Sequence, residues 1–119
     1  MKGSENYIPP KIQLLSIKEI FLFTGIPLYL LEGFASGKFK PSKSDCERLT
    51  DLARPFYKLQ DSQIRDYVDR KKFRELRPFI SFTEKQKLLS LESHAAYRKK
   101  LNELLDKHFD QIAAKILGN

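Results

Sequence analysis

The sequence predicts an all-α protein in which a small helix-turn-helix-like bundle is followed by a long C-terminal helix. Three observations lead to this fold class. Ser or Thr recurs three residues before Glu or Gln at the start of apolar segments, which is the capping-box pattern of helix N-termini. Glycine and proline interrupt the first half of the chain, whereas residues 83–117 contain neither. Between these signals, apolar residues recur at spacings of three and four, as on one face of a helix.

The first predicted helix begins after Ser16, which is placed to form a capping box with Glu19. Gly25 ends this helix, because glycine adopts the left-handed conformation at low cost. Pro27 is expected at the first position of a second helix, which Gly37 closes. Two short helices joined by a turn of two or three residues are therefore expected, and this is the arrangement of a helix-turn-helix.

A basic turn with Lys38 and Lys40 follows the second predicted helix. Ser44 and Glu47 then predict a second capping box, which opens a third helix. We expect this bundle to form a domain over residues 1–60, with residues 61–119 as a helical tail.

The pattern over residues 16–54 resembles the DNA-binding domain of the lambda-repressor/Cro-like helix-turn-helix family. In that family an apolar residue follows the turn Gly, apolar positions recur six and nine residues after it, and a Gly-basic-x-basic-Pro-Ser turn leads into another helix. Those places are taken here by Gly25, Ile26, Leu31, Phe34 and residues 37–42. The resemblance covers less than half of the chain, and it implies a small sequence-specific DNA-binding transcriptional regulator with double-stranded DNA as its partner.

We expect DNA contacts on three segments. The second helix would lie in the major groove, the basic turn would contact phosphates, and residues 70–77 would add contacts to the DNA backbone. The expected DNA-binding residues are Pro27, Leu28, Tyr29, Glu32, Lys38, Phe39, Lys40, Lys43, Arg70, Lys71, Lys72, Arg74 and Arg77.

A non-enzymatic protein-interaction module is the alternative function. Residues 16–56 carry six basic and five acidic side chains, a net charge of only +1. Leu28 and Tyr29 are expected on the exposed face of the second helix, and gathered apolar side chains of this kind usually mark a protein interface. The scaffold would then inhibit or recruit another protein.

The charge of the whole chain favours a polyanionic partner. Its 119 residues include 22 basic and 15 acidic side chains, which gives a net charge of +7. The single cysteine, Cys46, excludes an intrachain disulfide and fits a reducing compartment. We find no apolar signal core and no segment long enough to span a membrane, so we expect a cytoplasmic protein without membrane contacts.

The second half of the chain begins with a predicted helix over residues 62–75, capped by Asp61. Thr83 and Gln86 predict a third capping box, and the uninterrupted segment after them predicts one helix about 50 Å long. Its apolar stripe fits either packing on the N-terminal helices or the seam of a homodimer through residues 88–116. The stripe comprises Leu91, His94, Tyr97, Leu101, Leu104, Leu105, Phe109, Ile112 and Ile116.

Catalytic and metal sites are not expected. His94 and His108 are 14 residues apart, which is about 21 Å along one helix and too far for one metal ion. The sequence has no Gly-rich phosphate loop, and its acidic residues are interleaved with Lys and Arg as on solvated helix faces. We therefore expect neither enzyme activity nor a cofactor.

Overall fold

The computed structural model describes residues 5–118, and this part of the chain is all-α, as predicted. It contains seven α-helices and three 3-10 helices, with no strand among the described residues. The chain divides into two compact units, Met1–Ile64 and Arg65–Asn119. No helix of the described residues has both the length and the apolar character needed to cross a membrane.

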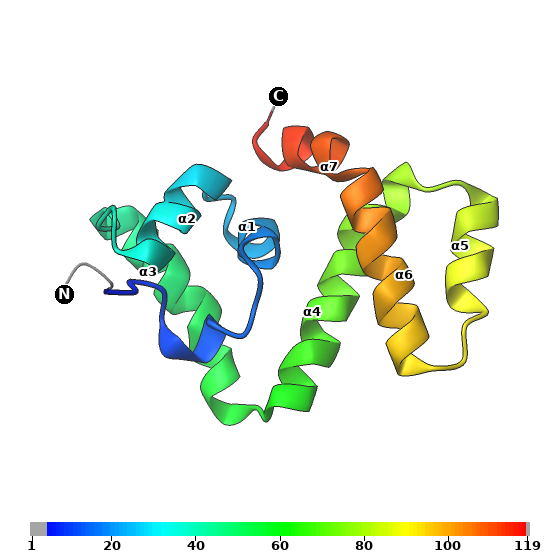
Figure 1. Ribbon diagram of the computed structural model, residues 1–119, viewed down its shortest axis with the longest axis horizontal. Coiled ribbons are helices and arrows are strands. Elements are labelled where there is room, and N and C mark those ends of the chain that lie inside the picture. The colour runs from blue at the N-terminus through cyan, green and yellow to red at the C-terminus, as the bar shows by residue number, and fades with distance from the viewer. Residues whose placement is uncertain (1–4, 119) are drawn as a thin grey trace. The chain divides into compact units, whose positions relative to one another are not determined.

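The first unit is a group of short helices, coloured blue to green in Figure 1. Helix α1 packs against both α2 and α3, and the 3-10 helix η1 contacts α3 and η2. The order along the chain is η1 (Pro10–Ile12), α1 (Ile17–Thr24), α2 (Leu28–Ser36), α3 (Lys43–Ala53) and η2 (Arg54–Lys58).

The predicted start and end of α1 are confirmed. The Ser16 hydroxyl accepts a hydrogen bond from the Glu19 N–H at 3.1 Å, and the Glu19 carboxylate accepts one from the Ser16 N–H at 2.8 Å. Gly25 ends the helix with a left-handed φ of 73°. Pro27 differs from the prediction, because it is the N-cap of α2 and not its first residue. Its extended ψ of 147° turns α2 back against α1.

The predicted cap of α3 is wrong by two residues. Ser42 is the N-cap, and its hydroxyl accepts from the Asp45 N–H at 3.1 Å, whereas Ser44 is an exposed residue of the first turn. Both serines have an acidic residue three positions later. The start at Ser42 makes α3 about half a turn longer than the predicted helix. Leu49 and Ala53 are buried, as expected for its apolar face.

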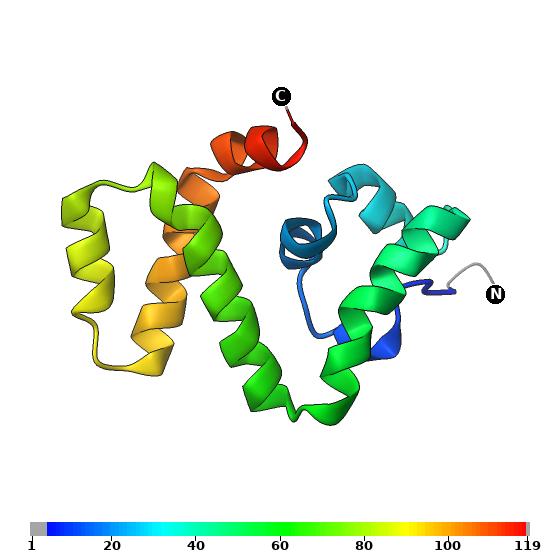
Figure 2. The same cartoon turned by 180° about the vertical axis from the view of Figure 1, so that it is seen from behind.

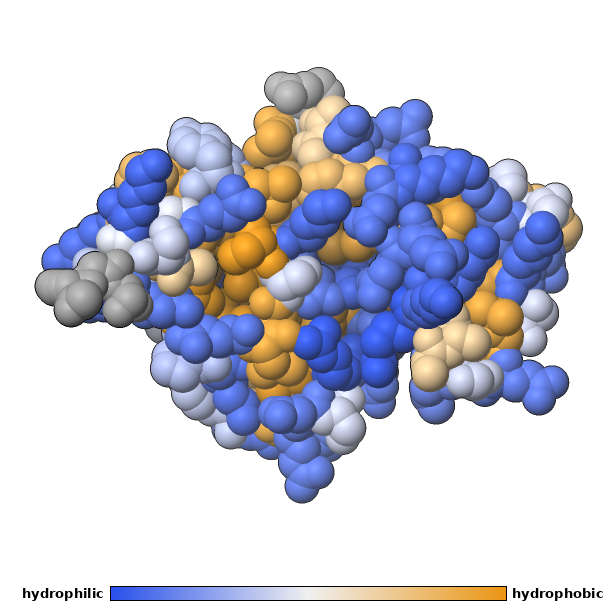
Figure 3. Space-filling view, in the orientation of Figure 1, coloured by the Kyte–Doolittle hydropathy of each residue, from blue (hydrophilic) through white to orange (hydrophobic). Residues whose placement is uncertain are grey.

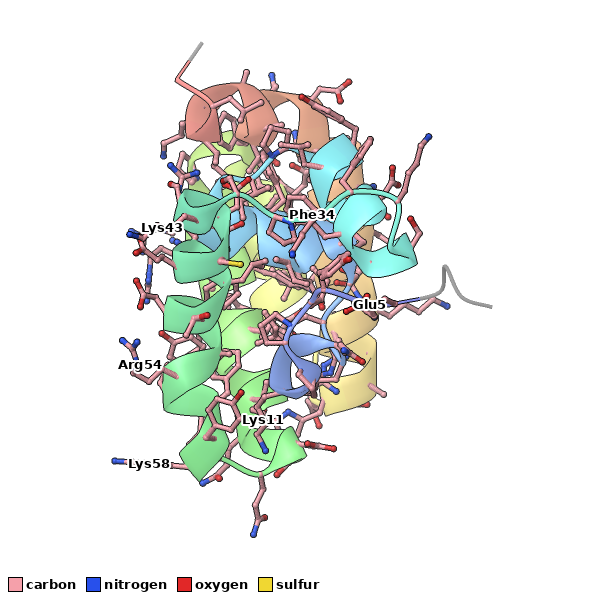
Figure 4. The ribbon with its side chains drawn as sticks, turned by 90° about the vertical axis from the view of Figure 1, so that its left-hand side faces the viewer. Glu5, Lys11, Phe34, Lys43, Arg54 and Lys58 are labelled. Carbon is pink, nitrogen blue, oxygen red and sulfur yellow. The ribbon has the colours of Figure 1, made fainter. Side chains whose placement is uncertain are left out.

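Three fully buried phenylalanines fill much of the core of the first unit. They are Phe21, Phe34 and Phe56, and Figure 4 shows Phe34 in the interior of the unit. Phe23 packs edge-on against Phe56, with ring centroids 6.5 Å apart. Because truncating such a side chain removes buried apolar area and leaves a cavity, these rings hold the short helices together.

A contact between Gly33 and Phe39 closes the turn after α2. Gly37 ends the helix with φ 80°, and the Phe39 N–H then donates to the Gly33 carbonyl at 3.1 Å. The Phe39 ring lies so close to Gly33 that a β-carbon there would overlap the ring, at 2.6 Å from Cε2 and 2.8 Å from Cγ. The Phe39 ring occupies the space that a side chain at residue 33 would need, and Phe39 is 37% exposed.

We expect Gly33→Ala to lower the free energy of unfolding by about 1–3 kcal/mol, because the new methyl group displaces the Phe39 ring. In a Phe39→Ala background the same change should be neutral or stabilising, since alanine is the better helix former by about 1 kcal/mol. Urea unfolding of the four proteins of this double-mutant cycle provides the measurement. An equal loss in both backgrounds would show that the ring is not what excludes a side chain at residue 33.

The second unit is built from the C-terminal part of α4 and the helices after it, shown from behind in Figure 2. Helix α6 lies beside α5, and two side-chain hydrogen bonds, Lys72–Asn102 and Arg98–Asp69, join it to α4. The elements are α4 (Asp61–Leu76), η3 (Arg77–Phe79), α5 (Phe82–Leu89), α6 (His94–Lys107) and α7 (Phe109–Ile116). Helix α4 includes Asp61, the residue predicted to precede it.

The prediction of one long C-terminal helix is wrong. The chain leaves the helical path at residues 90–93 and again at His108, which gives α5, α6 and α7. The start of α5 also differs, because its capping box consists of Ser81 and Glu84 and not of Thr83 and Gln86. Ser93 caps α6 by accepting from the Ala96 N–H at 3.2 Å. A serine cap therefore breaks a segment that contains no glycine or proline.

The break changes the role of the apolar stripe. Most of it is buried within the single chain, so these side chains are not available as the seam of the predicted homodimer. On the face seen in Figure 3, hydrophilic residues cover α6. Leu91 and His94, at the break, are exposed. The buried members are Leu101, Leu104, Leu105, Phe109 and Ile112.

The Glu84 carboxylate joins the start of α5 to the end of α6. It accepts hydrogen bonds from the Ser81 N–H at 3.0 Å and from the Lys107 ammonium at 2.8 Å. His108 Nε2 lies 3.6 Å from Oε1 of Glu84, the oxygen that accepts from the Ser81 N–H. The hydrogen bond from Lys107, followed by the one from Ser81, lowers the pKa of Glu84 from 4.5 to about 2.

This pKa has a consequence for acid stability. Because the pKa of Glu84 is lower in the folded chain, the stabilisation is complete above pH 4.5 and is lost as the pH falls to about 2. We expect Glu84→Gln to flatten this loss, since glutamine keeps the capping box but does not titrate. Urea unfolding of both proteins across this pH range measures the difference. Parallel pH profiles would contradict the assignment, and Glu103→Gln, at an exposed position of α6, is the matched control.

Candidate nucleic-acid interface

The exposed face of α2 carries few groups that read base edges. Tyr29 is 65% exposed, and Glu32 and Ser36 are also exposed. The Ser36 hydroxyl donates to the Gly33 carbonyl at 3.2 Å. Base edges are read mainly by Arg, Lys, Asn, Gln, Ser and Thr. On α2, whose residues are all described, Ser36 is the exposed residue of these types.

Two of the residues predicted on this face are partly covered. Pro27 and Leu28 are half-buried, so Leu28 is not the exposed apolar residue that the sequence predicted. The period of the helix explains the difference, because Leu28 lies in the first turn beside Leu31, which is fully buried. Tyr29 is therefore the main exposed apolar side chain of α2.

The basic turn after α2 presents its cations to solvent. Lys38 and Lys40 are exposed, and so is Lys43, the first residue of α3. The ammonium of Lys38 lies 5.6 Å from the centroid of the Phe39 ring, within the range of a cation–π interaction. The Phe39 ring packs against Gly33, and this contact restricts the conformation of the turn that carries Lys38 and Lys40.

Arg54 and Lys58, which the sequence did not indicate as DNA-binding residues, lie along α3 and η2 with Lys43, which it did. Figure 4 shows the side chains of Lys43, Arg54 and Lys58 on the same side of these elements, directed away from the unit. Arg54 pairs with Asp51 at 3.1 Å, and both side chains are exposed. The signal was present in the spacing, because Lys43 and Arg54 are 11 residues apart, which is about three helical turns. We call Lys43, Arg54 and Lys58 the α3 basic row.

The basic run of α4 separates into exposed and covered residues. Arg70, Arg74 and Arg77 are exposed, at spacings of four and three, so they form one stripe. Lys72 is only 2% exposed and donates to the Asn102 side chain at 2.7 Å. The prediction that Lys72 contacts DNA is therefore wrong. Consecutive helix residues point in different directions, so a continuous basic run on a packed helix cannot face solvent throughout.

Lys71 is intermediate in exposure between the exposed arginines and the buried Lys72. Its ammonium is 3.0 Å from the Glu75 carboxylate, and its side chain is 24% exposed. The exposed arginines belong to the second unit, whereas the basic turn and the α3 basic row belong to the first. The predicted DNA-binding residues thus form separate basic surfaces, one on each unit.

The described residues contain no group of three or more His, Cys, Asp or Glu side chains that could hold a metal ion. Comparison with protein-family models, with curated proteins and with solved structures finds no match to this chain.

Proposed function

We propose that this protein binds double-stranded DNA through its first unit and acts as a small regulator of the helix-turn-helix type. The observation that supports the proposal best is the basic turn. Lys38 and Lys40 are exposed on the turn directly after α2, where the Phe39 ring packs against Gly33, and Lys43 is exposed at the start of α3. Lys43, Arg54 and Lys58 of the α3 basic row are exposed on the next elements, where Glu47 and Asp51 are exposed as well and Arg54 pairs with Asp51.

In this proposal the lysines supply most of the affinity. Each lysine that neutralises a phosphate releases condensed counterions, which makes binding favourable and dependent on salt. Helix α2 would then lie in the major groove with Tyr29 toward the bases. Arg70, Arg74 and Arg77 of the second unit would add phosphate contacts.

We expect Lys38→Gln with Lys40→Gln to weaken binding to a mixed-sequence duplex and to flatten its salt dependence. Loss of two phosphate contacts should lower the slope of log K against log salt by about 1.8, at about 0.9 for each contact. Fluorescence anisotropy across a salt series measures this slope. Lys87→Gln with Lys99→Gln removes the same charge from exposed positions of α5 and α6 and should leave the slope unchanged. Absence of binding by the native protein at low salt would overturn the proposal.

A protein-interaction surface on α2 is the second candidate function. Tyr29 and Gly33 are one helical turn apart, and the Phe39 ring covers Gly33, so the two aromatic residues share one face of α2. Tyr29 is 65% exposed and Phe39 is 37% exposed. Exposed aromatic residues that are held in place are common anchors of protein interfaces.

Tyr29→Asp distinguishes the two functions. If α2 enters the major groove, a carboxylate at residue 29 faces the phosphate charge, and we expect duplex binding to weaken at least tenfold at low salt. If α2 serves a protein partner, the same variant should leave any duplex binding through Lys38 and Lys40 nearly unchanged. The anisotropy assay gives this comparison, and circular dichroism confirms that the exposed substitution has not unfolded the unit.

A further inference from the structure

The second unit contains a cavity between α4 and the start of α6. Its volume is about 400 Å³. Asp66, Asp69 and Arg70 line it from α4, and residues 91–94 with Tyr97 line it from the other side. The break between α5 and α6 therefore supplies one wall of the cavity.

A buried carboxylate in the wall of this cavity is only half satisfied. Asp69 is 7% exposed, and its Oδ2 accepts a hydrogen bond from Arg98 Nε at 2.9 Å. Its Oδ1 is buried and has no hydrogen-bond partner among the described residues. A buried acceptor without a donor costs about 1–3 kcal/mol, so such a group calls for an explanation.

The Arg98 guanidinium has a second carboxylate nearby. It also lies 3.9 Å from Asp66 Oδ1, so it stands between two carboxylates. Torsion about the last bond of an aspartate side chain is soft. Binding at Oδ1 requires a rotation of the Asp69 carboxylate about this bond toward the cavity.

The other walls favour an organic cation. Asp66 and Glu92 are exposed and place negative charge at the rim. Tyr97 and Leu91 supply an aromatic face and an aliphatic wall. Partial burial, followed by the charge of Asp69, raises the pKa of Tyr97, so its hydroxyl stays protonated. Aromatic faces and carboxylates together recognise cations that carry an apolar body.

We propose that this cavity binds a small primary ammonium ion with an apolar chain. The ammonium group donates to Oδ1 of Asp69, and the chain lies against Tyr97 and Leu91. Arg70 and His94 also line the cavity. The site belongs to the second unit and does not depend on the proposed DNA binding.

Titration of the full chain with n-hexylammonium, followed by amide NMR shifts, tests the proposal. We expect saturable shifts at residues 66–70 and 91–97. The neutral n-hexanol should bind at least tenfold more weakly, and the anionic n-hexanoate should not bind. Tighter binding of hexanoate would assign the cavity to anions at the start of α6, and equal binding of hexanol would assign it to apolar chains. Either result overturns the proposal, as does the absence of saturation.

Variants locate the binding group. Asp69→Asn should weaken hexylammonium binding at least tenfold, but it also alters the pair with Arg98 and can unfold the unit. Glu92→Gln, at an exposed position, keeps that pair and should weaken binding a few-fold. Glu103→Gln removes the same charge from α6 outside the cavity and should have no effect. Equal effects of Glu92→Gln and Glu103→Gln would show general charge attraction and contradict the site.

Discussion

Serine caps at helix starts are the interaction on which both units depend. Four helices begin at a serine whose hydroxyl accepts the N–H three residues later, namely those capped by Ser16, Ser42, Ser81 and Ser93. Helices of 8 to 14 residues, the range that these four span, are marginal in isolation. Each cap satisfies a donor that the helix leaves open and fixes where its apolar face begins. The core packing then stabilises helices whose boundaries are already set.

The sequence allowed the first unit to be predicted better than the second. Gly25 and Gly37 were informative because both adopt a left-handed φ that other residues avoid. Caps were less certain, since two candidate residues lay within two positions of each other at Ser42 and Ser44, and again at Ser81 and Thr83. Local chemistry permits either member of such a pair, and in both pairs the helix begins at the earlier one.

The candidate interface was predictable only in part, for a similar reason. Lys38, Lys40 and Lys43 follow a glycine turn and are exposed, as a turn position suggests. Lys72 could not be separated from its basic neighbours without knowing that α6 packs on that side of α4 and supplies Asn102. The burial of Asp69 Oδ1 without a hydrogen-bond partner likewise depends on the packing of α6 beside α4. Charge in a sequence shows what a surface can attract, whereas packing decides which charges reach the surface.

The break between α5 and α6 also determines how the second unit meets proteases. Residues 89–96 are all exposed, and they connect two helices that pack against each other. Proteases need an accessible segment that can extend in their active site, and exposed loops of this kind provide one. The fragments on either side of such a nick would still share the packing of α5 on α6 and the hydrogen bonds from Lys72 to Asn102 and from Arg98 to Asp69. The pair of Glu84 and Lys107, in which the lysine is exposed, adds little to these contacts.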